Sequence, residues 1–219
     1  MKQQTVKTKR LVLSPLSDEA LEALMNAQPD EDSRQPYREM LEGSRTHPEN
    51  RLWYTAWSMA KKDAPDRPLG DLCFKGPQVK GGVEIGYGIQ PEYEGQGYTT
   101  EAAQALIDWA FAQDDVYRVY AETEPNNRAS QRILEKLGFS PCGEGEEGPR
   151  FQLDNESPSW LAVYMCIGLS VGLSIGSFTD HISIGMCLGL CFGCALGTAL
   201  DAAARRRRQA VLDGEAEQE

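Results

Sequence analysis

The segment "VEIGYGIQPEYEGQGYTTEAAQALIDWAF", residues 83–111, decides the fold of this protein. Its first part alternates as a strand does, with Val83, Ile85, Tyr87 and Ile89 on one face and Glu84, Gly86, Gly88 and Gln90 on the other. Its last part predicts a helix over 99–111, because its apolar residues share one stripe: Ala102, Ala103, Leu106, Ile107, Ala110 and Phe111. A Gly-x-Gly turn, Gly95 to Gly97, joins the two. This arrangement favours an anion, because the backbone N–H groups and the helix dipole both attract negative charge.

Two common phosphate loops do not fit this turn. A dinucleotide-binding loop would need a third glycine where Thr100 stands and an acidic residue further on. A P-loop would need a Lys followed by Ser or Thr. The turn alone therefore leaves open which phosphate it holds.

The remaining segments predict one sheet with interspersed helices, an α+β or mixed α/β fold. Strands are expected at 10–13, 52–60, 69–76, 81–90, 116–124 and 150–153, with a turn at Pro65, Asp66 and Pro68. Helices are expected at 18–28 with Ser17 as cap, at 99–111, and after the Asn126–Asn127 pair, where Gly138 ends the helix in a left-handed conformation.

Composition limits the classes of function. The chain has 219 residues and a net charge of −11, which argues against a protein that binds the phosphate backbone, so no nucleic-acid partner is expected. Four of the six cysteines lie inside one apolar region, which indicates a reducing compartment rather than a disulfide framework. The apolar run in residues 1–15 is too short for a signal peptide, so the bulk of the protein is expected in the cytoplasm.

Two motifs in order carry a family resemblance. "FKGPQVKGGVEIGYGIQPEYEGQGYTTEAAQALIDWAF" followed by "AETEPNNRASQRILEKLGF" resembles the GNAT family of acetyl-CoA-dependent N-acetyltransferases, and most closely its ribosomal-protein-alanine branch. The resemblance covers about Lys9 to Asp154. It implies a single mixed, mostly antiparallel sheet flanked by helices. It also implies transfer of an acetyl group from acetyl-CoA to a primary amine, a protein N-terminus or a small molecule, by direct attack in a ternary complex without a metal.

The resemblance also implies cofactor-binding residues. The pyrophosphate of CoA would bind the loop Glu94, Gly95, Gln96, Gly97, Tyr98 and Thr99, and its arm would bond the backbone near Ile89. In the second motif, Asn127 and Ser130 would bond the arm, with Ser130 a donor to the departing thiolate. Both also fit helix caps.

Glu84 matches the strand glutamate that the family often uses as a base, and an ordinary solvent-facing carboxylate is the alternative. Two positions depart from the family pattern. Leu134 stands where many members have a tyrosine acid, and Glu94 replaces Arg or Gln, which places a like charge near a diphosphate.

The resemblance implies that the segment between the first two strands, Ser17 to Asn50, frames the amine site together with the last strands. Two acidic segments, "QPDEDSRQ" at 28–35 and "GEGEEG" at 143–148, fit attraction of a cationic amine or solvated turns.

The C-terminal part predicts a glycine-rich apolar hairpin. Small residues repeat every fourth position, which lets two helix backbones touch: Gly168, Gly172, Gly176, Gly185, Gly189, Gly193 and Gly197. The arms Trp160–Phe178 and Ile182–Leu200 are just long enough to cross a membrane, and Arg205–Arg208 would lie in the cytoplasm. The segment resembles bacterial glycine zippers. A soluble hairpin that packs or self-associates is the alternative.

The expected division is therefore an acetyltransferase-like domain at 1–156, the hairpin at 157–204 and a disordered tail at 205–219. A competing hypothesis is a non-catalytic acyl-CoA-binding or scaffold protein that assembles at a membrane through the hairpin.

Overall fold

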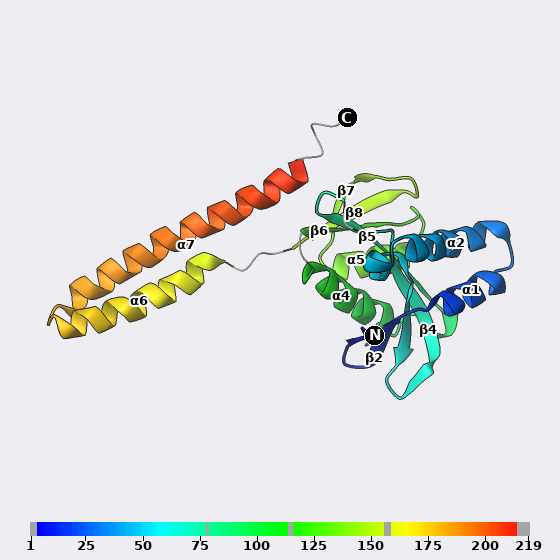
Figure 1. The fold of residues 1–219 in the computed structure, drawn as a ribbon, viewed down its shortest axis with the longest axis horizontal. Coiled ribbons are helices and arrows are strands. Elements are labelled where there is room, and N and C mark those ends of the chain that lie inside the picture. The colour runs from blue at the N-terminus through cyan, green and yellow to red at the C-terminus, as the bar shows by residue number, and fades with distance from the viewer. Residues whose placement is uncertain (1–3, 78, 114–115, 156–158, 214–219) are drawn as a thin grey trace. The chain divides into compact units, whose positions relative to one another are not determined.

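The computed structural model describes residues 4–77, 79–113, 116–155 and 159–213. The chain divides into two compact units, Met1–Asn155 and Glu156–Glu219, each of which is described by itself (Figure 1). The boundary expected at residue 156 lies outside the described residues.

The first unit is a sheet with helices beside it. Its strands are β1 (Val6–Lys7), β2 (Leu11–Pro15), β3 (Trp57–Lys61), β4 (Ala64–Phe74), β5 (Gly82–Ile89), β6 (Arg118–Glu122), β7 (Ser140–Glu144) and β8 (Pro149–Asp154). Its helices are α1 (Asp18–Ala27), α2 (Glu31–Thr46), α3 (Arg51–Tyr54), α4 (Tyr98–Phe111) and α5 (Arg128–Lys136), with 3-10 turns η1 (Pro48–Asn50) and η2 (Pro91–Tyr93).

The strand order is β1-β2-β3-β4-β5-β6-β8-β7. Among these described strands, β5 and β6 are parallel neighbours and the other neighbouring pairs are antiparallel. The expected single mixed, mostly antiparallel sheet with flanking helices is therefore confirmed.

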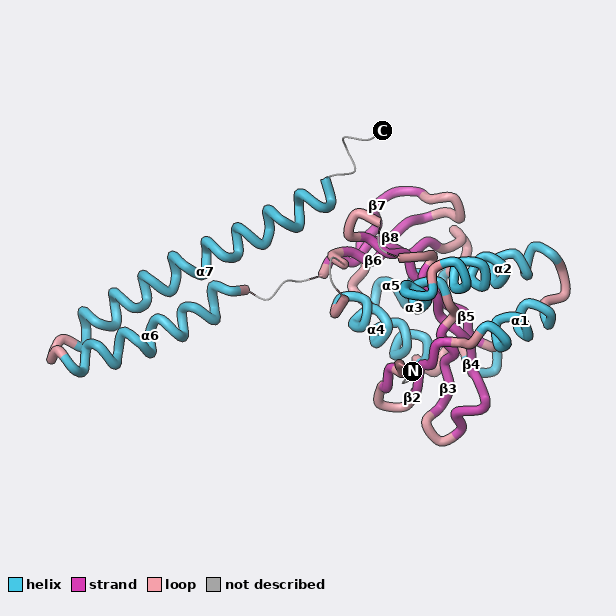
Figure 2. Tube along the Cα trace, viewed as in Figure 1, coloured by secondary structure: helices cyan, strands magenta, loops and turns pink. Residues whose placement is uncertain are grey.

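The alternation of β5 divides the sheet into two faces. Val83 and Ile85 enter the main core together with Leu106 and Ile107 of α4. A smaller buried cluster, Leu21, Leu41 and Ala56, lies between α1, α2 and the start of β3. Figure 2 shows α1 and α2 side by side, and these two helices contact each other. The opposite face of β5 carries Glu84, Gly86 and Gly88.

Several sequence predictions were wrong in detail. The expected strand at 52–60 starts only at Trp57, because η1 begins at Pro48 and runs into the helical turn of α3. The turn expected at Pro65 to Pro68 lies inside β4, where the β3–β4 ladder shifts register and tolerates proline. The sequence also did not predict α2, β1 or β7.

The second unit is a helical hairpin of α6 (Trp160–Phe178) and α7 (Ile182–Asp213). Its glycines face the opposite helix: a Cβ on Gly172 would lie 2.2 Å from the carbonyl oxygen of Gly185, and one on Gly168 would lie 2.2 Å from that of Gly189. Larger side chains would clash there. The glycines thus allow the two backbones to touch, as expected.

Asp201 of α7 fixes the pairing of the two helices at their open end. Its carboxylate accepts from the backbone N–H of Trp160 at 2.7 Å and from that of Leu161 at 3.3 Å, so α7 caps the N-terminus of α6.

The helix α7 also corrects the sequence prediction for the tail. It continues to Asp213, so the basic run Arg205–Arg208 is helical and not part of a disordered tail that begins at 205. Helical continuity from the apolar arm holds these residues in the same element. Residues 214–219 lie outside the described residues.

Both helices of this unit are long and apolar enough to cross a membrane by length and composition. Large apolar side chains are exposed on the hairpin, including Phe178 at 93%, Phe192 at 76% and Leu188 at 67%.

Candidate functional site

Strand β5 separates from β6 halfway along its length. It pairs with β4 from Ile85 to Ile89, but its pairing with β6 covers only Gly82 to Glu84. Among the described strands, the later residues of β5 therefore have no ladder partner on β6.

The loop after β5 needs glycine at two positions. Gly95 and Gly97 have φ angles of 70° and 76°, in the left-handed region that side chains disfavour. Gly97 is the N-cap of α4. Because glycine has no side chain, it accepts no side-chain hydrogen bond from the N–H groups of the first helical turn. Residues 94–97 are exposed, so their backbone can be reached by a ligand.

A pocket of about 550 Å³, here called the loop-side pocket, opens between β5, this loop and α5. Tyr87 and Gly88 line it together with six residues predicted from sequence to bind the cofactor: Ile89, Glu94, Gly95, Thr99, Asn127 and Ser130. Gly97 and Tyr98 line a smaller neighbouring pocket of about 220 Å³. Gln96 is in neither lining, and its carbonyl oxygen accepts from Arg10 at 3.1 Å.

Two hydroxyl groups meet in the loop-side pocket. The hydroxyl oxygens of Tyr87 and Ser130 are 2.8 Å apart. Burial raises the pKa of Tyr87 although the bond to Ser130 opposes it, so the phenol keeps its proton at neutral pH. The side chain of Asn127 accepts from the backbone N–H of Ser130 at 3.0 Å, which confirms the capping role. Leu134 is fully buried in the core.

The smaller pocket contains two cations that the sequence analysis missed. Arg132 and Lys136 of α5 line it with Gly95, Gly97 and Thr99. They are four residues apart and so share one helix face, a spacing visible in the sequence. Their charge is opposite to that of Glu94.

Contacts of Arg10, which lies between the first two strands, connect this part of the chain to the loop and to α4. Arg10 forms an ion pair with Glu101 of α4 at 2.6 Å, and its guanidinium carbon lies 4.4 Å from the ring centroid of Tyr98. Burial acts against the charged form of Glu101, but hydrogen bonds from Thr8 and Arg10 hold its pKa below the usual value. The loop-to-helix junction is therefore fixed from outside the pocket.

Glu84 lies in a different environment from the loop-side pocket. Its carboxylate forms an ion pair with Lys75 at 2.5 Å, and Lys75 also bonds Glu147 at 2.9 Å. Glu84 is not among the described residues that line the loop-side pocket, its smaller neighbour or the pocket between α1, α2 and the sheet. Its role as a base stays a prediction.

A second large pocket, here called the helix-side pocket, has a volume of about 590 Å³ and lies between α1, α2 and the sheet. Gly88 and Ile89 line both this pocket and the loop-side pocket. Its apolar lining includes Leu16, Ala20, Ala23 and Leu24. Asp71 of β4 also lines it and accepts from the hydroxyl of Tyr37 at 3.2 Å. Asp71 lies outside the segment 17–50 that the resemblance implies for the acceptor and was not predicted from the sequence.

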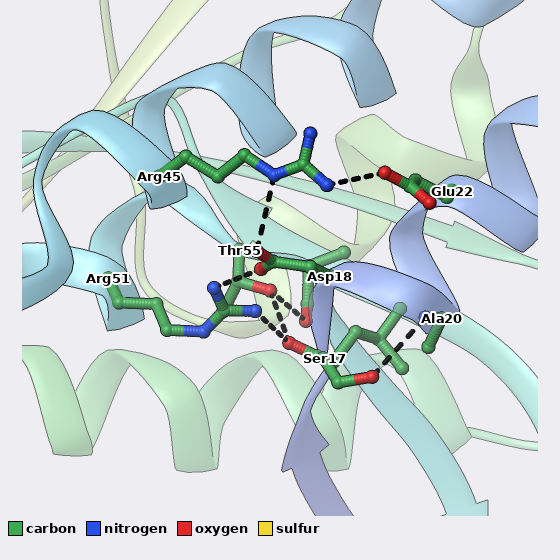
Figure 3. A network of polar contacts seen from close by, with 9 residues as sticks. Ser17, Asp18, Ala20, Glu22, Arg45, Arg51 and Thr55 are labelled. Atoms are coloured by element: carbon green, nitrogen blue, oxygen red, sulfur yellow. Dashed lines mark hydrogen bonds and ion pairs between the residues drawn. The ribbon is translucent and has the colours of Figure 1, made fainter.

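A polar network fixes α1 and α2 beside the helix-side pocket (Figure 3). Asp18 at the start of α1 pairs with Arg45 of α2 and Arg51 of α3, and Arg45 also pairs with Glu22. Burial opposes ionisation of Asp18, but the two arginines hold its pKa below the usual value. Thr55 donates to the carbonyl of Leu16 at 2.9 Å.

In the described part of the chain, no three His, Cys, Asp or Glu side chains are grouped so that they could hold a metal ion.

Comparison with known proteins matches both units. Residues 10–140 match the family model described as acetyltransferase (GNAT) domain, and residues 154–203 match that of a glycine zipper membrane protein. The uncharacterized N-acetyltransferase YjdG of Bacillus subtilis is 38% identical over 86 residues, which are 39% of this chain and 51% of YjdG. This chain spans about a third to a half of the length of the curated relatives that it matches.

Solved structures share the fold. The ribosomal-protein-S5-alanine acetyltransferase of Vibrio fischeri has a TM-score of 0.54 at 17% identity, covering 70% of this chain and 98% of its own. RimJ of Mycobacterium smegmatis, solved in complex with CoA-disulfide, has a TM-score of 0.52 at 16% identity, covering 70% of this chain and 88% of its own.

Proposed function

This chain belongs to the acetyltransferase (GNAT) family, and from that premise we propose that it transfers the acetyl group of acetyl-CoA to a primary amine by direct attack in a ternary complex. The observation that carries the proposal is that the loop-side and helix-side pockets share Gly88 and Ile89 in their linings. Ligands bound in the two pockets approach each other there, and such proximity converts a bimolecular reaction into an effectively unimolecular one.

The loop-side pocket and its smaller neighbour suit CoA. The pyrophosphate binds the backbone N–H groups between Gly95 and Thr99, where the helix dipole favours negative charge. Arg132 and Lys136 attract the phosphates, which offsets the like charge of Glu94. The arm of the cofactor extends along β5 toward Ile89, next to Asn127 and Ser130.

The chemistry needs a neutral amine, which attacks the thioester carbonyl while a backbone N–H binds the developing oxyanion. The C–N bond forms, the C–S bond breaks, and the thiolate leaves. A free thiol has a pKa of about 8.5, so the leaving group needs little help. The hydroxyl pair Ser130 and Tyr87 supplies a proton to it, in the role that a tyrosine at Leu134 would have.

A covalent acyl-cysteine route is not supported at Cys73. Burial raises the pKa of Cys73 on β4 to about 12, so its thiol stays protonated and is a weak nucleophile.

The hairpin is proposed as a membrane anchor that leaves the catalytic unit in the cytoplasm. Its exposed apolar side chains are unfavourable in water, and the basic run Arg205–Arg208 follows the apolar part of α7 as cytoplasmic flanks do. Its glycines face each other inside the hairpin, so contacts with lipid or another copy use the apolar outer surface.

Calorimetry with acetyl-CoA, followed by a thiol-release assay over amines, aminoglycosides and peptide N-termini, tests the enzymatic proposal. We expect acetyl-CoA to bind to the wild-type protein and Gly97→Asp to abolish this binding. We also expect at least one amine to cause the release of CoA. Binding without release across the panel would favour the acyl-CoA-binding scaffold instead.

Carbonate extraction tests the anchor separately. The full chain is expected to remain in the membrane pellet, and release into the soluble fraction contradicts insertion.

A further inference from the structure

The helix-side pocket combines an apolar lining with one acidic group. Among the described residues that line it, Asp71 is the only carboxylate and Tyr37 the only other ionisable group. The remaining lining is mainly aliphatic, with the amides of Gln28 and Gln90 and the hydroxyl of Ser58. A single negative group in such a lining is suited to a ligand with one positive charge.

Asp71 lies beside Gly88, which lines both pockets. In the sheet register it is opposite Gly88 of β5 and Ser58 of β3. A Cβ on Gly88 would lie 3.4 Å from the Oδ1 atom of Asp71, so the carboxylate packs over this bare backbone. Gly88 also lines the loop-side pocket, and a group held by Asp71 is therefore close to the proposed path of the acetyl arm.

The carboxylate has a donor but no cation among its described side-chain contacts. The hydroxyl of Tyr37 donates to Oδ2 at 3.2 Å. Burial, together with the charge of Asp71, raises the pKa of Tyr37 to about 12, so this hydroxyl keeps its proton. The other ionisable neighbour on the same strand is Cys73, whose thiol also stays protonated.

Burial raises the pKa of Asp71 above the usual value, although the bond from Tyr37 acts in the opposite direction. A raised pKa makes the carboxylate a better proton acceptor than an exposed aspartate. Glu84, the base predicted from sequence, instead has its charge matched by Lys75.

We propose that Asp71, oriented by Tyr37, binds the ammonium group of the acceptor and takes its proton, and that the acceptor is a monoamine on a mainly apolar body. This inference rests on the proposed function. The proton moves from the ammonium nitrogen to the carboxylate, and the neutral amine then attacks the thioester carbon. As the C–S bond breaks, the Ser130 and Tyr87 hydroxyl pair gives a proton to the thiolate and is reprotonated by the second proton of the nitrogen, and Asp71 returns its proton to water.

Amine binding is measured by calorimetry on the full chain saturated with CoA, which needs no turnover. The probes are phenethylamine, a tripeptide with an apolar N-terminal residue, and spermidine. The wild-type protein is expected to bind one of the two monoamines at least tenfold more tightly than spermidine. Tighter binding of phenethylamine identifies a small-molecule acceptor, and tighter binding of the tripeptide identifies a peptide N-terminus. Asp71→Asn is expected to weaken this binding at least tenfold. Acetyl-CoA affinity in that variant should stay within twofold of wild type, which also shows that it is folded.

The thiol-release assay separates this inference from the proposed function. Asp71→Asn should lower kcat by at least 100-fold, Tyr37→Phe by less, and Glu84→Gln by no more than threefold. Unchanged amine binding in Asp71→Asn, preference for spermidine, or a larger loss in Glu84→Gln overturns the assignment. Monoamine binding that depends on Asp71, without CoA release, supports the site and refutes acetyl transfer.

Discussion

The hydroxyl oxygen of Tyr87 lies 2.8 Å from that of Ser130, and both residues line the loop-side pocket. If this pair protonates the leaving thiolate, Tyr87→Phe lowers kcat by about 10- to 100-fold, at the low end of general acid catalysis because thiolates leave readily. The affinity for acetyl-CoA should change little, because the ring remains. Thiol release under saturating substrates measures the effect.

A double-mutant cycle with Ser130→Ala provides the control. Residues that act as one unit give non-additive losses, so the double variant should resemble Tyr87→Phe alone. Equal kcat values for wild type and Tyr87→Phe would remove the pair from the mechanism.

Gly97→Ala should weaken acetyl-CoA binding by about tenfold or more, because the side chain disfavours the φ of 76° that shapes the loop. Gly138→Ala is the matched control, since Gly138 has a φ of 86° at the end of α5 and lies outside the pocket linings described above. Both variants should lose a similar amount of stability, about 1 kcal/mol. Equal loss of acetyl-CoA affinity in both would show that strain alone, not the loop, is responsible.

Glu94→Gln should strengthen acetyl-CoA binding several-fold, because it removes a negative charge beside the expected diphosphate. Glu92→Gln, an exposed change two residues earlier, should leave the affinity within about twofold at physiological salt, where the Debye length is about 8 Å. Calorimetry at two salt concentrations tests this, and the gain should shrink at high salt. Weaker binding in Glu94→Gln would mean that Glu94 contributes a contact.

Asp71→Asn should stabilise the protein at pH 7. The raised pKa of Asp71 means that the folded state is favoured when this group is protonated, and that stability falls as pH rises from the unfolded value, about 3.9, through the folded value. Asparagine resembles the protonated form. The Tm at pH 7 should therefore rise, and the gain should vanish below about pH 4.

Asp66→Asn is the control for this measurement, because Asp66 is exposed on the same strand. A lower Tm for Asp71→Asn at pH 7 would show that the carboxylate is retained for stability and not for binding.

Gly172→Ile should destabilise the hairpin, although isoleucine has the higher helix propensity. A Cβ at Gly172 meets the carbonyl oxygen of Gly185 at 2.2 Å, so the helices must separate. Leu173→Ile, at an exposed neighbouring position, should have little effect. Thermal melts followed by circular dichroism in detergent compare the two, and equal melting temperatures would contradict the close packing.

Local patterns were enough to predict β5, the glycine loop, α4 and the Asn127 cap, because strand alternation, left-handed glycines and caps are properties of neighbouring residues. The helix α2 was missed because it carries few apolar residues and contains Pro36. Strand β7 is exposed throughout and so has no alternating pattern.

The candidate site was predictable on its loop side and not on its helix side. Asp71 and Tyr37 are 34 positions apart in the sequence and meet only after α2 packs beside β4. Arg132 and Lys136 had a readable spacing on α5, but their relation to Gly95 and Gly97 depends on how α5 lies beside the loop.

Single-turnover transfer of label from radioactive acetyl-CoA, with and without the best amine of the panel, tests direct acetyl transfer most immediately. The account predicts that label passes to the amine, that CoA is released only when the amine is present, and that no label stays on the protein. A burst of CoA with labelled protein in the absence of amine, or no transfer to any amine, would contradict it.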